Sequence, residues 1–425
     1  MSSSDQLAIA VDLGTTTIAA SLVAPATEER LAVTGALNPQ REFGLDVVSR
    51  LDAACRSSEN LEQMKRLVNK TLHSLVRELL ELAGASAKSL QLVAIAGNPA
   101  MEHLFLGLPV TSLAHPPYRP IFSVGTTVNT ASLGWDTTVE AYAFPLPGGF
   151  VGGDLVAFLY GEGVSGPRPP GPGPRLFLDL GTNGELALVI GDAIYATSAA
   201  AGPAFEGGNL ACGMAALPGA ISDLRITGER LALTTIRGEN PAGICGSGVI
   251  AAVVELLRAG VLDHTGRLRE PAEISSNLGN RIVEHNGEAA FTLYRDAKRE
   301  IYLSQQDIRQ VQLAKSAIRA GIEVLCTRAG VSAGAVLETV VTGSFGAHIV
   351  PERLKNIGIF PEKMIEICSF VREGALMGVE KALCAHRGIA AVDRLAQAIR
   401  VVPLSGTSLF EKHFLEQMNF PKSAD

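Results

Sequence analysis

Apolar residues alternate with small or polar residues at the start of the chain and again after residue 174. Alternation rich in β-branched residues is typical of strands, and the short Gly/Thr and Pro/Thr/Glu turns between them indicate an antiparallel meander. The meander is predicted twice, each time followed later by a further strand. The predicted strands are 7–11, 18–23, 31–36, 90–95, 176–180, 185–190, 193–198 and 336–341.

Between these strands, apolar residues recur every three or four positions, which is the spacing of one helix face. The longest of these patterns opens with Ser304 and Asp307, a helix-capping pair. The segment from 108 to 134 has several prolines and no clear period, which is typical of an insertion or a long connection. The predicted helices are 46–55, 61–82, 100–105, 155–160, 244–259 and 304–327.

The repeated order of meander, helix and strand indicates an internal duplication. Residues 166–174 are almost entirely proline and glycine and break regular structure between the two copies. We therefore expect an α/β fold with a first domain over 1–165, carrying an insertion around 108–147, and a second domain over 175–425 after the 166–174 linker. We leave open whether the C-terminal segment packs back on the first domain.

Composition narrows the class of protein. The 425 residues are 47% hydrophobic and 19% charged, which is enough apolar surface for two or three buried cores. The formal net charge of -7 argues against a nucleic-acid partner. Asp12 interrupts the first apolar run, no basic region precedes it, and the most apolar run, 244–257, is too short to span a bilayer. We expect a cytoplasmic protein without a membrane partner.

The six cysteines form no C-x-x-C pair and show no close spacing with the histidines. This spacing argues against a zinc site or an iron–sulfur cluster carried by this chain alone. Most of the thiols are expected to be small buried side chains.

The tetrapeptide Asp-Leu-Gly-Thr occurs twice, each time directly after a predicted strand: Asp12-Leu-Gly-Thr-Thr-Thr17 and Asp179-Leu-Gly-Thr-Asn-Gly184. Such a turn exposes backbone N–H groups and hydroxyls that bind phosphate, while the carboxylate can hold Mg²⁺. One copy alone would suggest a polar hairpin turn, but the repetition favours a nucleotide site. The candidate phosphate-binding residues are Gly14, Thr15, Thr16, Thr17, Gly181, Thr182, Asn183 and Gly184.

Two more glycine turns follow predicted strands. Gly97-Asn98 leads into a short helix, whose start favours anions. Gly343-Ser344-Phe-Gly346 lacks side chains where an adenosine ring could lie against the backbone, although a tight strand-to-helix turn is the alternative. The Gly-rich stretch 201–214, which contains Glu206, is interpreted either as a moving or partner-facing loop or as a connection beside the phosphates, without a catalytic role.

In this order the four turns resemble the phosphate 1, connect 1, phosphate 2 and adenosine motifs of the actin/sugar kinase/Hsp70 superfamily. Within it, the chain is similar to the ATP-dependent reductive activators of corrinoid proteins over nearly its whole length. The stretches that carry this similarity are Gly97-Asn-Pro-Ala-Met-Glu-His103, Ala201-Gly-Pro-Ala-Phe-Glu-Gly207, Gly243-Ile-Cys-Gly-Ser-Gly248, Thr342-Gly-Ser-Phe-Gly346 and the spaced pattern from Asp307 to Gly321.

The resemblance implies two actin-like (ribonuclease H-like) domains with a nucleotide cleft between them, and ATP and Mg²⁺ as cofactors. Asp12 and Asp179 would hold the metal and position the attacking water. Gly343 and Gly346 would face adenosine, with Ser344 in the same turn.

Asp154 stands where some kinases of the superfamily place a general base. A helix N-cap after Gly153 is an equally open interpretation of this residue.

The resemblance further implies ATP-dependent reduction of Co(II) to Co(I) in a corrinoid (cobamide) protein. Family members usually carry a [2Fe-2S] domain ahead of the ATPase part, whereas this chain starts at its first strand. We therefore expect no iron–sulfur cluster on this chain, a corrinoid protein as partner and a separate ferredoxin-like electron donor. A homodimer is left open.

Three alternatives stay open from the sequence. The first is a small-metabolite kinase of the same superfamily, with Asp154 as the base. The second is a nucleotide-switched scaffold without catalysis. The third is an activator of radical dehydratases, which would hold a cluster between two protomers through Cys212 and Cys245.

Overall fold

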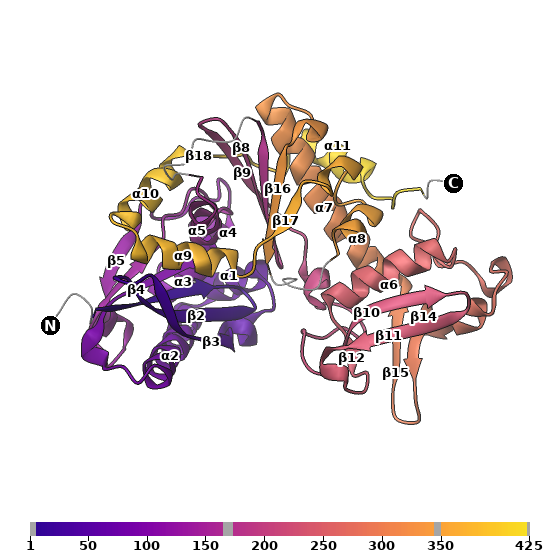
Figure 1. The fold of residues 1–425 in the computed structure, drawn as a ribbon, viewed down its shortest axis with the longest axis horizontal. Coiled ribbons are helices and arrows are strands. Elements are labelled where there is room, and N and C mark those ends of the chain that lie inside the picture. The colour runs from indigo at the N-terminus through magenta and orange to yellow at the C-terminus, as the bar shows by residue number, and fades with distance from the viewer. Residues whose placement is uncertain (1–5, 165–172, 344–349, 423–425) are drawn as a thin grey trace. The chain divides into compact units, whose positions relative to one another are not determined.

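The computed structural model describes residues 6–164, 173–343 and 350–422. The chain forms two compact units, which are coloured along the sequence in Figure 1. Unit 1 contains Met1–Gly173, Ala187–Thr197 and Glu373–Val402. Unit 2 contains Pro174–Leu186, Ser198–Arg372 and Pro403–Asp425.

The first sheet has the strand order β3-β2-β1-β4-β6-β5. β1, β2 and β3 form an antiparallel meander, and β4 pairs parallel to β1, as β6 does to β4. The meander and the fourth strand agree with the sequence pattern, whereas β5 and β6 lie in the segment interpreted as an insertion and extend the sheet at one edge. The strands are β1 (Leu7–Leu13), β2 (Thr17–Ala24), β3 (Glu29–Leu37), β4 (Leu90–Gly97), β5 (Thr126–Asn129) and β6 (Glu140–Ala143).

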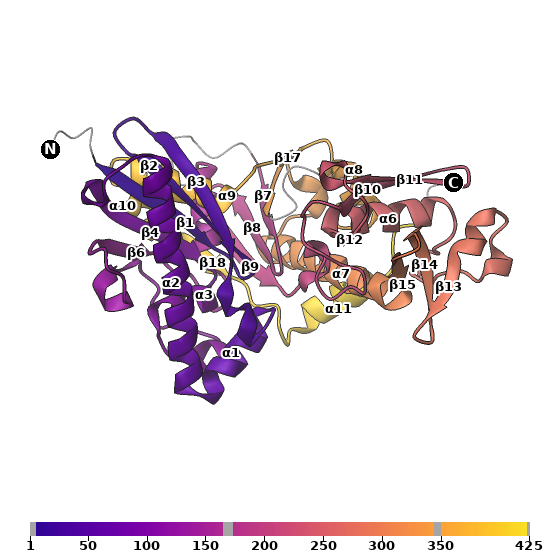
Figure 2. The ribbon, with the colours of Figure 1, turned by 90° about the horizontal axis from the view of Figure 1, so that it is seen from below.

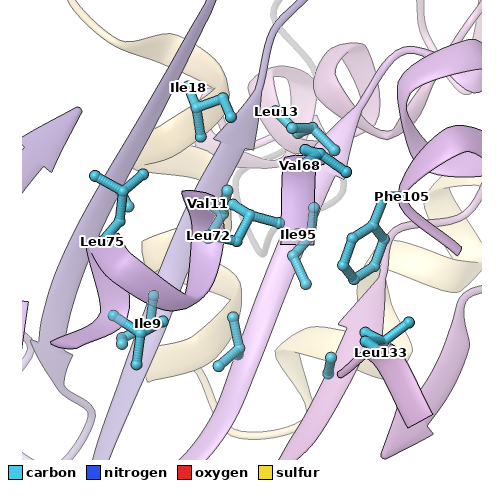
Figure 3. Packing of buried hydrophobic residues seen from close by; sticks show 14 of the residues in the cluster. Ile9, Val11, Leu13, Ile18, Val68, Leu72, Leu75, Ile95, Phe105 and Leu133 are labelled. Atoms are coloured by element: carbon cyan, nitrogen blue, oxygen red, sulfur yellow. The ribbon is translucent and has the colours of Figure 1, made fainter. Parts of the chain in front are cut away.

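One face of this sheet packs against α1 (Val47–Arg56), α2 (Ser58–Leu82) and α3 (Pro99–Leu106). Ile9, Val11 and Leu13 of β1 are buried among apolar side chains of α2 (Figure 3). Figure 2 shows α2 lying in front of the meander strands. Because successive residues of a strand point to opposite faces, the odd-numbered side chains of β1 form this core.

The opposite face packs against α5 (Gly153–Gly161) and α9 (Gly374–Cys384), which come from distant parts of the chain. Ala10 of β1 is opposite Ser21 of β2, and the Ser21 hydroxyl donates to Glu380 of α9. Small residues on this face allow the helices to approach closely. The segment 373–402, which also contains α10 (Gly388–Ala398), is thus part of unit 1 although unit 2 precedes it in sequence.

The second sheet has the strand order β17-β16-β7-β8-β9-β18. Its part β9-β8-β7-β16-β17 repeats the order β3-β2-β1-β4-β6, and β16 is parallel to β7 as β4 is to β1. The repeat confirms the α/β class with two actin-like domains. The strands are β7 (Arg175–Leu180), β8 (Gly184–Ile190), β9 (Ala193–Ala199), β16 (Glu338–Gly343), β17 (Cys368–Phe370) and β18 (Ile399–Val401).

Unit 2 also carries two small sheets, ordered β11-β10-β12 and β13-β14-β15. Along the described ranges, no helix is both long and apolar enough to cross a membrane. The strands of the small sheets are β10 (Ala220–Thr227), β11 (Arg230–Thr235), β12 (Gly243–Ile244), β13 (Ile282–His285), β14 (Glu288–Arg295) and β15 (Glu300–Ser304). The other helices are α4 (Thr111–Ala114) in unit 1 and α6 (Gly246–Arg258), α7 (Gln305–Ala329), α8 (Pro351–Asn356) and α11 (Ser408–Glu416) in unit 2.

Helix α7 carries the whole spaced pattern from Asp307 to Gly321, and it contacts the segment that follows α11. Lys315, which is 1% exposed, donates from Nζ to the carbonyl oxygens of Gln417 and Asn419, just beyond α11. Burial lowers the pKa of Lys315 to about 8. A cation at the carbonyl end of a helix satisfies acceptors that have no partner inside that helix.

The contact between α5 and α9 predicts a strict need for glycine at position 378. A Cβ there would lie 1.8 Å from the carbonyl oxygen of Ala157 in α5. We expect Gly378→Ala to lower the free energy of unfolding by about 2 kcal/mol, because this clash outweighs the ~1 kcal/mol by which alanine favours a helix over glycine. The midpoint of urea unfolding, followed by circular dichroism, measures the change.

Gly334→Ala is the matched control, because the nearest atom to a Cβ at that position is 4.0 Å away. Its unfolding midpoint should not move. A Gly378→Ala protein that unfolds at the wild-type midpoint would contradict the close packing of the two helices.

Candidate functional site

The two Asp-Leu-Gly-Thr motifs form equivalent turns in the repeated sheets. Asp12 is the next-to-last residue of β1, and Asp179 is the next-to-last residue of β7. The residues that follow make the turn, and the fifth residue after the aspartate opens the next strand. These residues are Gly14, Thr15, Thr16 and Thr17 in turn 1, and Gly181, Thr182, Asn183 and Gly184 in turn 2.

In both sheets the neighbouring parallel strand ends in glycine beside the turn. Gly97 of β4 stands opposite Leu13, and Gly343 of β16 stands opposite Leu180. A Cβ on Gly97 would lie 2.8 Å from the Leu13 carbonyl oxygen, and one on Gly343 would lie 2.2 Å from that of Leu180. The two glycines are thus equivalent, and both are required by the close approach of the strand backbones.

The rest of the predicted adenosine turn, Ser344 and Gly346, lies outside the described residues.

Asn98 joins turn 1 to helix α3. Its Oδ1 accepts the Met101 N–H at 3.1 Å, as the N-cap of the helix, and its Nδ2 donates to Thr15 Oγ1 at 2.9 Å. Asn98 is 6% exposed and Thr15 is 7% exposed. The structure therefore brings together two residues that lie far apart in sequence and that the motifs predict independently.

A buried carboxyl group lies behind this turn. Glu102 of α3 is 0% exposed, and its Oε1 accepts the Gly97 N–H at 3.0 Å. Burial raises the pKa of Glu102 well above its usual value, and the charge of Asp154 raises it further, against the opposing hydrogen bond from Gly97. Burial therefore favours the neutral form of Glu102, and the hydrogen bond from Gly97 holds the backbone of the turn that carries Asn98.

Helix α5 brings Asp154 to the same end of the sheet. Gly152 precedes the helix as its N-cap, and a Cβ there would lie 2.4 Å from the Gly97 carbonyl oxygen and 2.8 Å from Asp154 Oδ1. Asp154 is the second residue of the helix, so the interpretation of Asp154 as the N-cap is wrong. Its Oδ1 accepts the Leu155 N–H at 2.8 Å, and burial raises the pKa of Asp154 to about 6.

Turn 2 has a different side-chain partner. Thr182, which is 6% exposed, donates from Oγ1 to Glu206 Oε2 at 2.5 Å. Glu206 ends a short 3-10 helix, Pro203–Glu206, and Gly207 follows it with a φ of 77°. Sequence reasoning did not give Glu206 a role at the turn. In the sequence, Glu206 differs from its neighbours as the one carboxylate within the glycine-rich stretch 201–214.

Cys212 and Cys245 both lie in unit 2, and neither is fully exposed. Cys245 is buried and donates to the Ile221 carbonyl oxygen at 3.3 Å. Burial, with the nearby charges of Asp307 and Glu300, raises the pKa of the Cys212 thiol, and a raised pKa disfavours the thiolate that binds metal. Within residues 6–164, 173–343 and 350–422, no group of three or more His, Cys, Asp or Glu side chains is placed to hold a metal.

A cavity of about 470 Å³ in unit 2 lies beside Cys212 and the connection between β14 and β15. Its lining residues are Ala211, Cys212, Gly213, Ala242, Lys298, Arg299, Glu300 and Ile301, none of which belongs to the predicted turns.

Residues 174–425 match the family model for the C-terminal domain of RACo, the ASKHA domain, and residues 7–165 match the model for the RACo middle region. The corrinoid activation enzyme RamQ of Eubacterium limosum is 32% identical over 367 residues, which cover 83% of this chain and 60% of RamQ. A [Co(II) methylated amine-specific corrinoid protein] reductase of Methanosarcina barkeri is 24% identical over 403 residues, which cover 85% of this chain and 67% of that protein.

Among solved structures, the reductive activator for corrinoid,iron-sulfur protein superposes with a TM-score of 0.88 at 28% identity. The match covers 100% of this chain and 67% of that one. This chain therefore spans 60% of the length of RamQ and about two thirds of the length of the other two proteins. The two family models together cover both halves of the duplicated fold, and the chain belongs to the RACo family, with the ASKHA domain in its C-terminal part.

Proposed function

We propose that this chain is the ATPase part of a reductive activator of corrinoid proteins. ATP binds with Mg²⁺ at the two Asp-Leu-Gly-Thr turns, and its hydrolysis drives the reduction of Co(II) to Co(I) in a partner protein. The observation that carries the proposal is the repeated turn, with a buried and hydrogen-bonded threonine in each copy, in a chain of the RACo family. RamQ and the other two relatives are named for acting on corrinoid proteins.

The residues at the turns fit this nucleotide chemistry. Asp12 and Asp179 are carboxylates at strand ends, and Mg²⁺ prefers oxygen ligands of this kind. When bound, Mg²⁺ neutralises the charge that develops on the phosphates. Asp12 and Asp179 orient the attacking water, while the turn N–H groups and hydroxyls hold the phosphates and Gly343 faces the adenosine. Asn98 supports Thr15 from behind, through a buried hydrogen bond.

The electron does not come from ATP. An external low-potential donor, of the ferredoxin type, supplies one electron to Co(II), and water cleaves ATP to ADP and phosphate. Each ~59 mV by which the cobalt potential lies below that of the donor costs a factor of ten in this equilibrium. ATP overcomes the mismatch by favouring a state of the activator that binds the corrinoid protein more tightly. By linkage, the corrinoid protein then tightens the binding of ATP.

The proposal is tested by mixing the chain, Mg-ATP, a low-potential reductant and Co(II) corrinoid proteins under anaerobic conditions. We expect the absorbance of Co(I) to appear with at least one corrinoid protein, and to depend on ATP. Reduction that proceeds equally well without ATP, or ATP turnover that yields a phosphorylated small metabolite, would overturn the proposal.

Removal of the carboxylate at turn 2 should stop ATP turnover. We expect Asp179→Asn to lower the rate of ATP hydrolysis by about 100-fold or more, because the neutral amide lacks the negative charge with which the carboxylate binds the metal and polarises the water. Phosphate release measures the rate, and circular dichroism checks the fold. Asp192→Asn, in the exposed turn between β8 and β9, is the matched control and should turn over like the wild type. Hydrolysis at the wild-type rate by Asp179→Asn would exclude this residue from the mechanism.

The buried Asp154 carboxyl group should lower the free energy of unfolding when it ionises. Its folded pKa of about 6 exceeds the unfolded value of ~3.9, so the folded state binds the proton more tightly, and stability falls as pH rises through this interval. Asp154→Asn does not ionise, and we expect it to gain on the order of 2 kcal/mol relative to the wild type between pH 4 and pH 7.

Urea unfolding of both proteins across this pH range measures the gain. Asp192→Asn, whose side chain is exposed, should show a constant difference from the wild type. A constant difference for Asp154→Asn as well would contradict the burial of its charge.

A further inference from the structure

Turn 1 contacts a buried asparagine that belongs to none of the predicted motifs. Asn38 directly follows β3 and is the N-cap of a short 3-10 helix, Pro39–Phe43. Asn38 is 0% exposed. It belongs to unit 1, as turn 1 does, so the contacts between them lie within one compact unit.

Asn38 makes hydrogen bonds to two carbonyl groups of turn 1. Its Oδ1 accepts the Gln40 N–H at 3.0 Å, which sets the orientation of the amide. The NH₂ group is therefore the end that faces turn 1, and Nδ2 donates to the Gly14 carbonyl oxygen at 2.9 Å. The backbone N–H of Asn38 donates to the Thr16 carbonyl oxygen, also at 2.9 Å. Two carbonyl groups of the turn thus point toward Asn38.

These two bonds decide where N–H groups of the turn point. A peptide unit is planar and trans, so its N–H points away from its C=O. Because the Gly14 and Thr16 carbonyl groups point toward Asn38, the N–H groups of Thr15 and Thr17 point in the opposite direction. N–H groups that face one side of a turn form a concave site for anions. A carbonyl group turned to that side would instead repel a phosphate oxygen.

The segment that carries Asn38 is itself anchored to helices α1 and α2. Gln40 is 0% exposed and donates from Nε2 to the Met64 carbonyl oxygen in α2 at 3.2 Å. Gly44, just beyond the 3-10 helix, accepts a hydrogen bond from Arg50 Nε of α1 at 2.9 Å. These contacts fix the backbone on both sides of the helix, so Asn38 is a fixed support for the turn.

We infer that Asn38 is a positioning residue for the binding of phosphate at turn 1: it holds two carbonyl groups away from the ligand, so that the Thr15 and Thr17 N–H groups face a phosphate oxygen. Thr15 is supported twice, because Asn98 holds its hydroxyl and Asn38 holds the peptide group that precedes it. The inference rests on the proposed binding of ATP and deepens it, because the residue that orients the donors lies outside the turn itself.

Asn38→Ser tests this role. The serine hydroxyl still accepts the Gln40 N–H as a helix cap, but it is too short to reach Gly14, so the Gly14 carbonyl group loses its support. We expect the dissociation constant of Mg-ATP, measured by calorimetry, to rise by about 10-fold, because hydrogen bonds to a charged phosphate are weakened when their donors lose alignment.

Asn69→Ser is the matched control. Asn69 is 2% exposed, and its Nδ2 donates at 2.9 Å to the carbonyl oxygens of Lys65 in α2 and Phe105 in α3, neither of which belongs to turn 1. The serine removes buried bonds of the same kind, so both variants should unfold at a lower urea concentration than the wild type. We expect Asn69→Ser to keep the affinity for Mg-ATP within about 2-fold of the wild type, because its site is independent of the turn.

Asn38→Asp is the second variant. The carboxylate keeps the size of the side chain and still caps the 3-10 helix, but it cannot donate to the Gly14 carbonyl oxygen. We expect Asn38→Asp to weaken the binding of Mg-ATP by about 10-fold or more, which keeps the role testable if Asn38→Ser does not fold.

The amide signal of Thr15 gives a readout that a merely structural role would not move. In a chain labelled with ¹⁵N-threonine, the Thr15 signal is identified by its loss in Thr15→Ser. We expect this signal to move to lower field when Mg-ATP binds to the wild type or to Asn69→Ser, because the N–H donates to phosphate. The movement should be smaller in Asn38→Ser saturated with Mg-ATP.

The failure of the inference differs from the failure of the proposed function. A wild-type chain that binds no Mg-ATP overturns the proposed function. Binding by Asn38→Ser and Asn38→Asp at the wild-type affinity, or equal weakening by Asn69→Ser, overturns the inference while the binding of ATP stands. A Thr15 amide signal that stays in place when Mg-ATP binds to the wild type also overturns the inference.

Discussion

The close approach of two parallel strands at their ends is the constraint on which the rest of turn 1 depends. A Cβ on Gly97 would lie 2.8 Å from the Leu13 carbonyl oxygen, and a Cβ on Gly152 would lie 2.4 Å from the Gly97 carbonyl oxygen. This crowding fixes the backbone at the start of α3 and leaves Asn98 with its amide 2.9 Å from Thr15. The position of the Asn98 amide beside the Thr15 hydroxyl therefore depends on glycine at positions 97 and 152, where a side chain would collide with the backbone.

Two buried carboxyl groups near turn 1, those of Glu102 and Asp154, affect the stability of the protein and the charge close to the turn. Glu102 Oε2 is buried and has no hydrogen-bond partner within the part of the chain that the structure describes. An ionised Glu102 would be costly there, and burial raises its pKa and so favours the neutral form. Asp154 is ionised above a pKa of about 6 and lowers stability when charged. Groups with such shifts are common at functional sites, where stability is given up for chemistry.

The sequence predicted the strands and turns whose formation depends mainly on residues that are close together in the chain. Alternation along the strands and the Asp-Leu-Gly-Thr turns placed β1, β2, β7 and β8 within one or two residues, because backbone geometry and side-chain period suffice there. The short strand β6 was missed, since its pairing with β4 is what makes it a strand. The contact between Thr182 and Glu206 joins residues 24 positions apart through an irregular path, which no period encodes. The roles of the predicted turn residues in nucleotide binding stay predictions.

The two copies of the turn have the same backbone pairing between strands, whereas their threonines have different side-chain partners. Register within a sheet forces the same pairs in each copy, Leu13 with Gly97 and Leu180 with Gly343, because a slip would move every side chain to the wrong face. The partner of each threonine is under no such constraint, since it comes from outside the meander: Asn98 follows the neighbouring parallel strand, whereas Glu206 follows β9. An amide and a carboxylate give the same hydroxyl opposite polarity. Identical tetrapeptides in one chain therefore do not imply identical hydrogen bonding of their hydroxyls, because the partner of each hydroxyl comes from a different element.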